Sequence, residues 1–183
     1  VVAASPSAAA YGPPYPLQIS RRLPPVKLPP DNRPTLEGVA LGRTLFHDPR
    51  LSVNNTQSCA SCHDQRAAFS DVGKRFSLGA DGLPGKRNAM PLFNLAWQAE
   101  FFWDGRTRRL RDQVLEPIQD PLEMHQPLDK AVGKLAADPA YPAKFEAAFG
   151  AGGITAERLG LALEQFLLTQ VSQDSKFDQA LRG

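Results

Sequence analysis

The amino-acid sequence predicts a mainly α-helical domain with long loops, preceded by an extended proline-rich arm. Several segments carry apolar residues at the spacing of an amphipathic helix, and no segment shows a β-strand pattern of comparable strength. Residues 1–34 contain nine of the 17 prolines of the chain. Because proline fixes φ and lacks a backbone N–H, this arm is expected to be extended, either loose or laid across a surface.

The folded body is expected to begin near Thr35, which divides the chain into an arm over residues 1–34 and a domain over residues 35–183. A short helix is predicted there by four apolar residues: Leu36, Val39, Ala40 and Leu45. The polar residues 52–56 predict a turn, and the glycine-rich stretch 69–91 predicts a loop long enough to be functional.

Four further helices are predicted in the second half of the chain by apolar residues at helical spacing. Their apolar positions are, in chain order, Leu110, Val114 and Leu115; Leu128, Val132 and Leu135; Phe145 and Phe149; and Leu159, Ala162, Leu163, Phe166 and Leu167. Pro117 is expected to end the first of these helices, and Pro142 to open the third. Thr155 is expected to cap the N-terminus of the fourth, with Glu157 in its first turn.

Length and composition suit one domain with a hydrophobic core. The chain has 183 residues, of which 42% are hydrophobic and 22% are charged, and these values are ordinary for a globular protein. The formal net charge of +2 is too small to indicate a nucleic-acid or membrane-surface partner. No apolar run approaches the ~20 residues of a membrane span. Because the sequence starts without Met or an apolar leader, any signal peptide is expected to have been removed.

The most specific motif is Cys59-Ala60-Ser61-Cys62-His63. Cys-x-x-Cys-His is the pattern by which c-type haem is attached: each thiol forms a thioether with one haem vinyl group, and the histidine binds the iron. The chain has no other cysteine. The motif therefore predicts one covalently bound haem c, held by Cys59, Cys62 and His63, in a helical domain like that of c-type cytochromes.

Three other uses of the two cysteines stay open. A thioredoxin-like redox pair would need a strand before Cys59 and a helix after it, but no β-rich run precedes this residue. A structural zinc site needs four ligands, and a second Cys/His pair is missing. A disulfide between residues three apart would leave His63 without a role.

Three further blocks accompany the haem motif. They are residues 41–46 (LGRTLF) with 48–52 (DPRLS), residues 101–106 (FFWDGR), and residues 117–118 (PI) with 123–124 (EM). With these blocks in order, residues 36–182 resemble the bacterial di-haem cytochrome c peroxidase and MauG family. The resemblance implies the N-terminal, peroxide-reacting haem domain of that family.

The resemblance also implies partners. Members of the family continue into a second haem domain that receives electrons, whereas this chain ends at Gly183. Hydrogen peroxide is the implied substrate, and the implied electron donor is a second haem domain, an external cytochrome or a cupredoxin. MauG-like members instead use the oxidised haem to modify a protein. Because bacteria attach haem c outside the cytoplasm, a periplasmic location is expected.

Individual roles follow from the same resemblance. Glu123 matches the distal acid/base, Gln113 the distal hydrogen-bond donor, and Pro117 a residue packed over the distal face of the haem. Trp103 matches the aromatic residue between the two haems that relays electrons. Each residue alone would have an ordinary structural explanation, and their joint match supports the assignment. Glu123 can shuttle a proton near pH 7 only if burial raises its pKa.

Two loop positions depart from the pattern or add to it. Many family members carry a histidine in the loop after the haem motif that caps the iron until reduction withdraws it. The aligned position here is Ala80, so the iron is expected to be open without reductive activation. Asn88 matches a residue of the family that helps bind calcium. The other calcium ligands come largely from the second domain, so the prediction of calcium binding here depends on one side-chain oxygen. His47 and His125 are expected to be polar residues in turns.

A single-haem electron-transfer cytochrome without catalysis is the alternative function. It would need a sixth iron ligand, and Met124 and Met90 are the only thioethers in the chain. A His/Met pair gives iron a raised potential, and Gln113 and Glu123 would then have no role. A third reading is a domain that binds haem but turns over slowly without its electron-entry partner.

Overall fold

The computed structural model describes residues 12–182. Its α-helices are α1 (Leu36–Phe46), α2 (Cys59–Cys62), α3 (Leu110–Gln113), α4 (Glu116–Gln119), α5 (Leu128–Ala136), α6 (Ala140–Phe149), α7 (Ala156–Leu168) and α8 (Lys176–Ala180). The 3-10 helices are η2 (Pro49–Leu51), η3 (Gln65–Ala67) and η4 (Leu95–Trp97). Within residues 12–182 there is no β-strand, only isolated β-bridges, so the predicted all-α fold class is confirmed.

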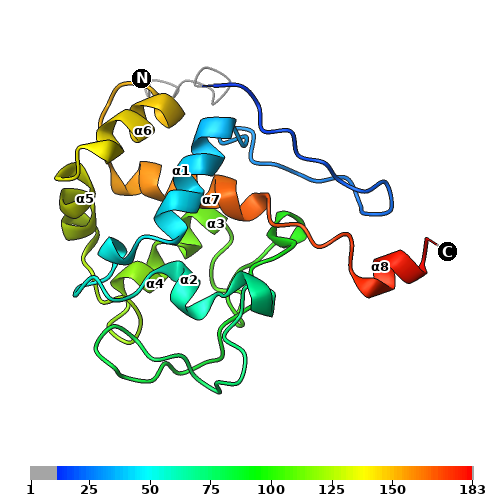
Figure 1. Ribbon diagram of the computed structural model, residues 1–183, viewed down its shortest axis with the longest axis horizontal. Coiled ribbons are helices and arrows are strands. Elements are labelled where there is room, and N and C mark those ends of the chain that lie inside the picture. The colour runs from blue at the N-terminus through cyan, green and yellow to red at the C-terminus, as the bar shows by residue number, and fades with distance from the viewer. Residues whose placement is uncertain (1–11, 183) are drawn as a thin grey trace.

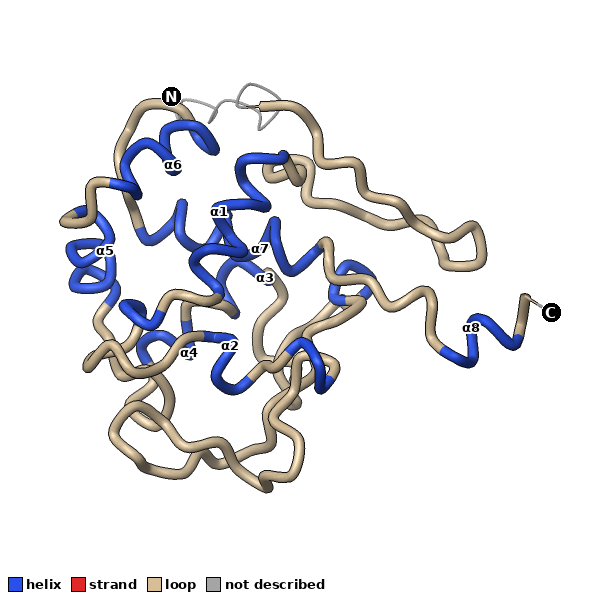
Figure 2. Tube along the Cα trace, in the orientation of Figure 1, coloured by secondary structure: helices blue, strands red, loops and turns tan. Residues whose placement is uncertain are grey.

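The helices gather on one side of the molecule, and long loops between α2 and α3 form the other side (Figures 1 and 2). The C-terminal helix α8 lies away from the other helices (Figure 1). In the described part of the chain, no helix is both long enough and apolar enough to cross a membrane.

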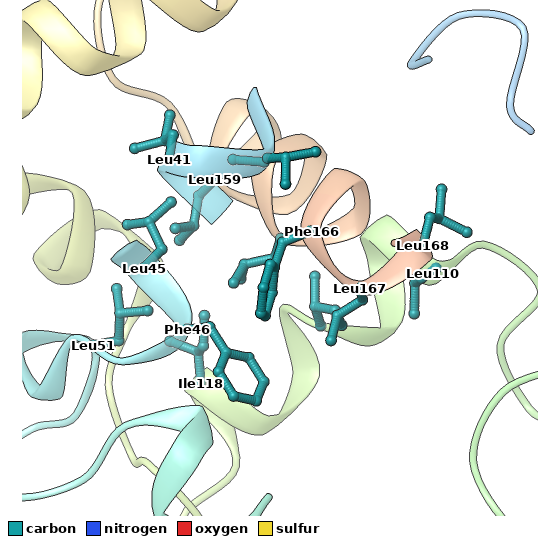
Figure 3. Packing of buried hydrophobic residues seen from close by; sticks show 14 of the residues in the cluster. Leu41, Leu45, Phe46, Leu51, Leu110, Ile118, Leu159, Phe166, Leu167 and Leu168 are labelled. Atoms are coloured by element: carbon teal, nitrogen blue, oxygen red, sulfur yellow. The ribbon is translucent and has the colours of Figure 1, made fainter. Parts of the chain in front are cut away.

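Helices α1 and α7 pack against each other at the centre of the fold (Figure 1). A Cβ atom added at Gly42 would lie 2.0 Å from the carbonyl oxygen of Ala162, so only glycine permits this approach of the two backbones. Side chains from both helices are buried together with side chains from η2, α3 and α4: Leu41, Leu45, Phe46, Leu51, Leu110, Ile118, Leu159, Phe166, Leu167 and Leu168 (Figure 3). This core places α3 beside α7 and α4 beside α3.

The N-cap predicted for α7 at Thr155 is confirmed, and Thr35, for which no cap was predicted, caps α1 in the same way. The hydroxyl oxygen of Thr35 accepts a hydrogen bond of 3.1 Å from the N–H of Gly38, and that of Thr155 accepts one of 3.1 Å from the N–H of Arg158. Each bond satisfies an N–H that has no partner inside the helix. All five apolar residues predicted for the stripe of α7 are buried.

The structure departs from the predicted helices at three points. Leu36 and Ala40, two of the four apolar residues that predicted the helix α1, are exposed, whereas Val39 and Leu45 are buried. Pro117 does not end a helix: α3 stops at Gln113, and Pro117 lies in the first turn of α4, where its missing N–H costs no hydrogen bond. Pro142 likewise lies in the first turn of α6, which begins two residues earlier.

The described part of the arm, residues 12–34, contains no helix and ends in a buried polar network. Asn32 is only 1% exposed. Its Nδ2 donates to Glu164 at 2.7 Å, and the Nε2 of Gln165 donates to its Oδ1 at 2.7 Å. The end of the arm is therefore laid against α7. Residues 1–11, for which an extended path was also predicted, lie outside the described residues.

Candidate functional site

A cavity of about 290 Å³ lies between α2, α3, α4, α7 and the loops that join them. Its wall includes the residues of the haem motif and every other residue to which the sequence assigned a role in the site. These are Cys59, Cys62, His63, Asn88, Trp103, Gln113, Pro117 and Glu123. Side chains from distant parts of the sequence therefore meet at one place.

The short helix α2 carries both cysteines of the cavity wall. The N–H of His63 donates to the carbonyl of Cys59 at 3.0 Å and so ties the histidine to the helix. Burial raises the pKa of Cys59 to about 12 and also raises the pKa of Cys62. Both sulfurs are held as thiols, whereas the cysteines of a redox-active pair have a lowered pKa. The surroundings therefore argue against a thioredoxin-like site.

The ring of His63 is hydrogen-bonded to the main chain through its Nδ1 atom. Its Nδ1 lies 2.8 Å from the carbonyl oxygen of Phe69. Because a carbonyl can only accept, Nδ1 carries the proton and Nε2 keeps its lone pair. Burial lowers the pKa of His63, although hydrogen bonds between its ring and the main chain of Phe69 and of Met90 oppose this shift. A neutral imidazole binds iron through the nitrogen that carries no proton.

The carbonyl that bonds to His63 is placed by an unusual turn. Ala68 and Phe69 both have φ of 56°, a left-handed value that costs about 1–2 kcal/mol for a residue other than glycine. The ring of Phe69 is buried and meets the ring of Phe46 edge-on, with the centroids 6.0 Å apart. The N–H of Phe69 donates to the carbonyl of Asp64 at 2.8 Å. These contacts stabilise the turn.

Gln113 and Glu123 are the two polar residues predicted to act on the substrate. Gln113 is 6% exposed, and its side-chain amide has no hydrogen-bond partner within residues 12–182, so it is available to a molecule in the cavity. Glu123 is an exposed residue of the cavity wall, although protein atoms lie around its carboxyl group. This desolvation raises the pKa of Glu123; nearby Asp120 also raises it, and Arg106 opposes the shift.

Trp103 and Asn88 are joined in the cavity wall. Trp103 is 59% exposed, and its Nε1–H donates to the main-chain carbonyl of Asn88 at 2.9 Å. The Nδ2 of Asn88 donates to the carbonyls of Lys74 and Arg75, each at 3.0 Å. Across residues 12–182, no group of three or more His, Cys, Asp or Glu side chains is placed to hold a metal ion. A role of Asn88 in calcium binding stays a prediction.

Arg106 is a residue of the cavity wall that the sequence analysis did not single out. Its guanidinium carbon lies 3.4 Å from the centroid of the Phe102 ring, which is a close cation–π contact. It also pairs with Asp104 and Glu116, each at 3.1 Å. Arg106 ends the FFWDGR block, but the order of residues in that block does not reveal which of them stack.

The three histidines of the chain lie at different places in the structure, and one of them lines the cavity. His63 belongs to the cavity wall, whereas His47 and His125 do not line the cavity and are exposed, as expected for polar residues in turns. Ala80, at the position of the capping histidine of many relatives, is also absent from the wall of this cavity. All three histidines of the chain fall in the described residues, so His63 is the one imidazole that lines it.

The residues of the cavity fit haem c. Two thiols and the imidazole of His63 share one wall with a group of apolar side chains: Phe46, Leu92, Val114, Leu163 and Leu167. Lys86 and Arg87 belong to the same wall and suit the two carboxylates of haem. Met90 and Met124, the candidate sixth ligands of the alternative function, line it as well.

Known proteins resemble this chain in sequence. The profile of the family described as di-haem cytochrome c peroxidase matches residues 36–183. Cytochrome c peroxidase Ccp of Escherichia coli K12 is 40% identical over 160 residues, which cover 87% of this chain and 33% of that protein. The methylamine utilization protein MauG of Methylorubrum extorquens is 41% identical over 164 residues, which cover 89% of this chain and 46% of that protein.

Solved structures resemble it as well. A MauG-like protein associated with microbial copper homeostasis matches with a TM-score of 0.85 at 34% identity, over 92% of this chain and 50% of that chain. The diheme peroxidase BthA from Burkholderia thailandensis matches with a TM-score of 0.70 at 28% identity, over 82% of this chain and 43% of that chain. The chain thus spans between about a third and a half of the length of these relatives.

Proposed function

Because the chain belongs to the di-haem cytochrome c peroxidase family, we propose that it is the part of a peroxidase-type oxidoreductase that binds haem and reacts with hydrogen peroxide. One observation supports this proposal above the others. A single cavity is lined by two thiols, by a histidine whose Nδ1 is hydrogen-bonded to the main chain, and by the polar residues Gln113 and Glu123.

The haem motif would hold the cofactor, with one haem c per chain. Cys59 and Cys62 would bind it through thioether bonds, and the Nε2 of His63 would bind the iron. When bound, haem c supplies the redox-active iron at which the O–O bond of peroxide is cleaved. The hydrogen bond from Nδ1 to the Phe69 carbonyl fixes the orientation of the imidazole and increases its basicity as a ligand.

Gln113 and Glu123 would act on the peroxide itself. The amide N–H of Gln113 donates a hydrogen bond that stabilises negative charge on the leaving oxygen. The carboxylate of Glu123 takes a proton from one peroxide oxygen and returns it to the other, a task that a raised pKa suits. Pro117 offers no hydrogen-bond donor in the cavity wall and helps to exclude water.

Electrons and protons must balance. Reduction of one hydrogen peroxide to two waters uses two electrons and two protons. The electrons would come from a second haem domain, an external cytochrome or a cupredoxin, with Trp103 as the relay at the cavity wall. Oxidation of a protein substrate, as in a MauG-like protein, would draw the same two electrons from that substrate. Because bacteria attach haem c outside the cytoplasm, the proposal includes a periplasmic location.

We also propose an iron that peroxide reaches without prior reductive activation. Ala80 has no group that can bind iron, and the exposed His47 and His125 do not line the cavity. Calcium would need ligands in addition to Asn88. The Nδ2 of Asn88 already donates to two carbonyls, so its Oδ1 would be the atom offered to the ion.

Turnover tests the proposal. The haem-loaded protein is mixed with hydrogen peroxide and a reduced small cytochrome c, and oxidation of the cytochrome is followed by absorbance. We expect two cytochromes to be oxidised per peroxide, at a rate well above that of free haem at the same concentration. A rate equal to that of free haem would contradict the proposal.

A further inference from the structure

The loop of residues 78–84 lies against the segment between α4 and α5, which carries Glu123. The N–H of Ala80 donates to the carbonyl of Glu123 at 2.6 Å. A Cβ atom added at Gly79 would lie 2.2 Å from the carbonyl oxygen of Leu122, so the two backbones are in direct contact there. The loop therefore touches the main chain of the proposed proton-transfer residue.

One side-chain pair joins the two segments. The Nδ1 of His125 lies 2.6 Å from Oδ2 of Asp81, and the two side chains are 47% and 40% exposed. His125 has φ of 51°, a left-handed value that costs about 1 kcal/mol or more for a residue other than glycine. The bond to Asp81 offsets this cost. Neither residue lines the cavity, so neither touches the substrate or the haem.

The segment before the haem motif makes a second contact with the loop. The Nδ2 of Asn54 donates to the carbonyl of Ala80 at 2.8 Å, and the N–H of Val53 donates to the carbonyl of Met124 at 2.9 Å. The segment that precedes the haem motif is thus bonded both to the loop and to the residue after Glu123. Together with the pair of Asp81 and His125, these hydrogen bonds connect three segments: the loop, the segment before the haem motif, and the residues that follow Glu123.

We propose that Asp81 and His125 form a clasp that keeps the loop of residues 78–84 on the segment between α4 and α5 and so holds Glu123 in the cavity wall. The inference rests on the proposed function, in which Glu123 moves a proton between the peroxide oxygens. Asp81 and His125 are positioning residues, because they act through the backbone of Ala80 and of Glu123.

The clasp also governs the surroundings of the Glu123 carboxyl group. Asp120 and Glu116 face this group and raise its pKa, and Arg106 faces it and lowers its pKa, but desolvation has the largest effect. The charged group that faces His125 is Asp81, and the main chain of His125 donates to the carbonyl of Asp120 at 3.0 Å. Opening of the clasp would move the Glu123 carboxyl group away from the protein atoms that desolvate it and return its pKa toward the ordinary value.

The test compares matched variants of the haem-loaded protein by stopped-flow measurement of its reaction with hydrogen peroxide over a range of pH. Asp81→Ala removes one partner, and His125→Gly removes the other while keeping a residue that tolerates positive φ. His125→Asn keeps both a donor for Asp81 and tolerance of positive φ. Asp174→Ala is the control, because it breaks an exposed pair with Arg182 in the C-terminal segment.

We expect Asp81→Ala and His125→Gly to slow the reaction at neutral pH by a factor between about 10 and about 100, the scale on which misplacement of a catalytic group acts. The acid limb of the pH profile should move to lower pH. The double variant should be no slower than either single one, because both remove the same contact. Asp174→Ala and His125→Asn should behave like the unchanged protein.

Glu123→Gln separates the clasp from the proposed function. If Glu123→Gln slows the reaction but Asp81→Ala and His125→Gly change neither the rate nor the acid limb, the clasp is wrong and the role of Glu123 stands. If Glu123→Gln leaves the rate unchanged, the role of Glu123 is wrong and the clasp has nothing to position. Because both clasp side chains are about half exposed, their removal leaves the buried core intact.

Discussion

The Nδ1 atom of His63 lies 2.8 Å from the carbonyl oxygen of Phe69, in a turn where the preceding Ala68 and Phe69 itself both have φ of 56°. Two neighbouring residues thus adopt a sterically unfavourable backbone conformation, and this conformation directs the carbonyl of Phe69 toward the imidazole of His63. Such strain is characteristic of functional sites, where the surrounding structure maintains it. The hydrogen bond places the proton of the neutral His63 ring on Nδ1 and leaves the lone pair on Nε2.

The strain predicts a stabilising substitution. Ala68→Gly should raise the free energy of unfolding by about 1 kcal/mol, because glycine adopts positive φ without a steric cost. Ala67→Gly, one residue earlier in the 3-10 helix η3, should lower it by about 0.5–1 kcal/mol, because glycine there only adds backbone freedom. Urea denaturation measures both values. A lower stability of Ala68→Gly would show that the turn is not strained.

The contact between α1 and α7 predicts a large loss of stability. Gly42→Ala would place Cβ 2.0 Å from the carbonyl oxygen of Ala162, and forced shifts of this kind cost about 1–3 kcal/mol or more. Gly133→Ala is the matched control, since nothing lies within 4 Å of its added Cβ. In helix α5 that change should stabilise the protein by up to about 1 kcal/mol. Equal changes in the free energy of unfolding for Gly42→Ala and Gly133→Ala would contradict the close packing of α1 against α7.

The sequence predicted most helices because their signals are local. Thr155 and the apolar stripe that follows it define α7 with no reference to the rest of the chain, and the structure confirms both. The prediction for Pro117 was wrong because the effect of a proline depends on whether it stands in the first turn of a helix or at its end. The spacing of the apolar residues does not reveal which of these two positions Pro117 occupies.

The site was less accessible to local reasoning. The haem motif is contiguous, so its chemistry could be read directly, but Gln113 and Glu123 were identified only through their match to a family. Their placement in one cavity depends on the packing of α3 against α7 and of α4 against α3, with Glu123 in the segment that follows α4. The pair of Asp81 and His125 had no sequence signal, because the two residues are 44 positions apart and meet only through the path of a loop.

The raised pKa of Glu123 predicts the pH dependence of the peroxide reaction. Transfer of the proton begins with the ionised carboxylate, so the rate should fall as pH decreases through the pKa of Glu123. Because burial raises this pKa above 4.5, the acid limb should lie above the range of an ordinary glutamate. Glu123→Gln should lack the limb and react about 10²–10⁴-fold more slowly. Stopped-flow measurement of the rate against pH for both proteins tests this prediction. An identical acid limb in Glu123→Gln would show that a group other than Glu123 causes it.

The proposed relay predicts that Trp103→Phe separates two steps. Trp103 is 59% exposed and makes one hydrogen bond to Asn88, so its loss should change the free energy of unfolding by no more than about 1–1.5 kcal/mol. The reaction with peroxide should keep its rate, whereas oxidation of a reduced cytochrome should slow. Stopped-flow and steady-state rates on the same sample test this. Unchanged donor oxidation would mean that electrons take another path.

The two thiols predict the mode of haem attachment. In the unchanged protein, haem should remain with the polypeptide after acid–acetone extraction, since two thioether bonds hold it. Cys59→Ala/Cys62→Ala should lose all haem in that extraction, and either single variant should retain one bond. Mass spectrometry of the intact chain measures this directly. A haem-free mass for the unchanged protein, expressed with its haem-attachment machinery, would contradict covalent binding.

The ferric protein, observed by absorption and low-temperature EPR before and after one equivalent of hydrogen peroxide, tests the central proposal most directly. We predict a high-spin signal that peroxide depletes quickly, because His63 is the one imidazole that lines the cavity and Ala80 offers no ligand. A low-spin signal that peroxide leaves unchanged would contradict it. That result would mean a sixth ligand such as Met90 or Met124 and an electron carrier in place of a peroxidase.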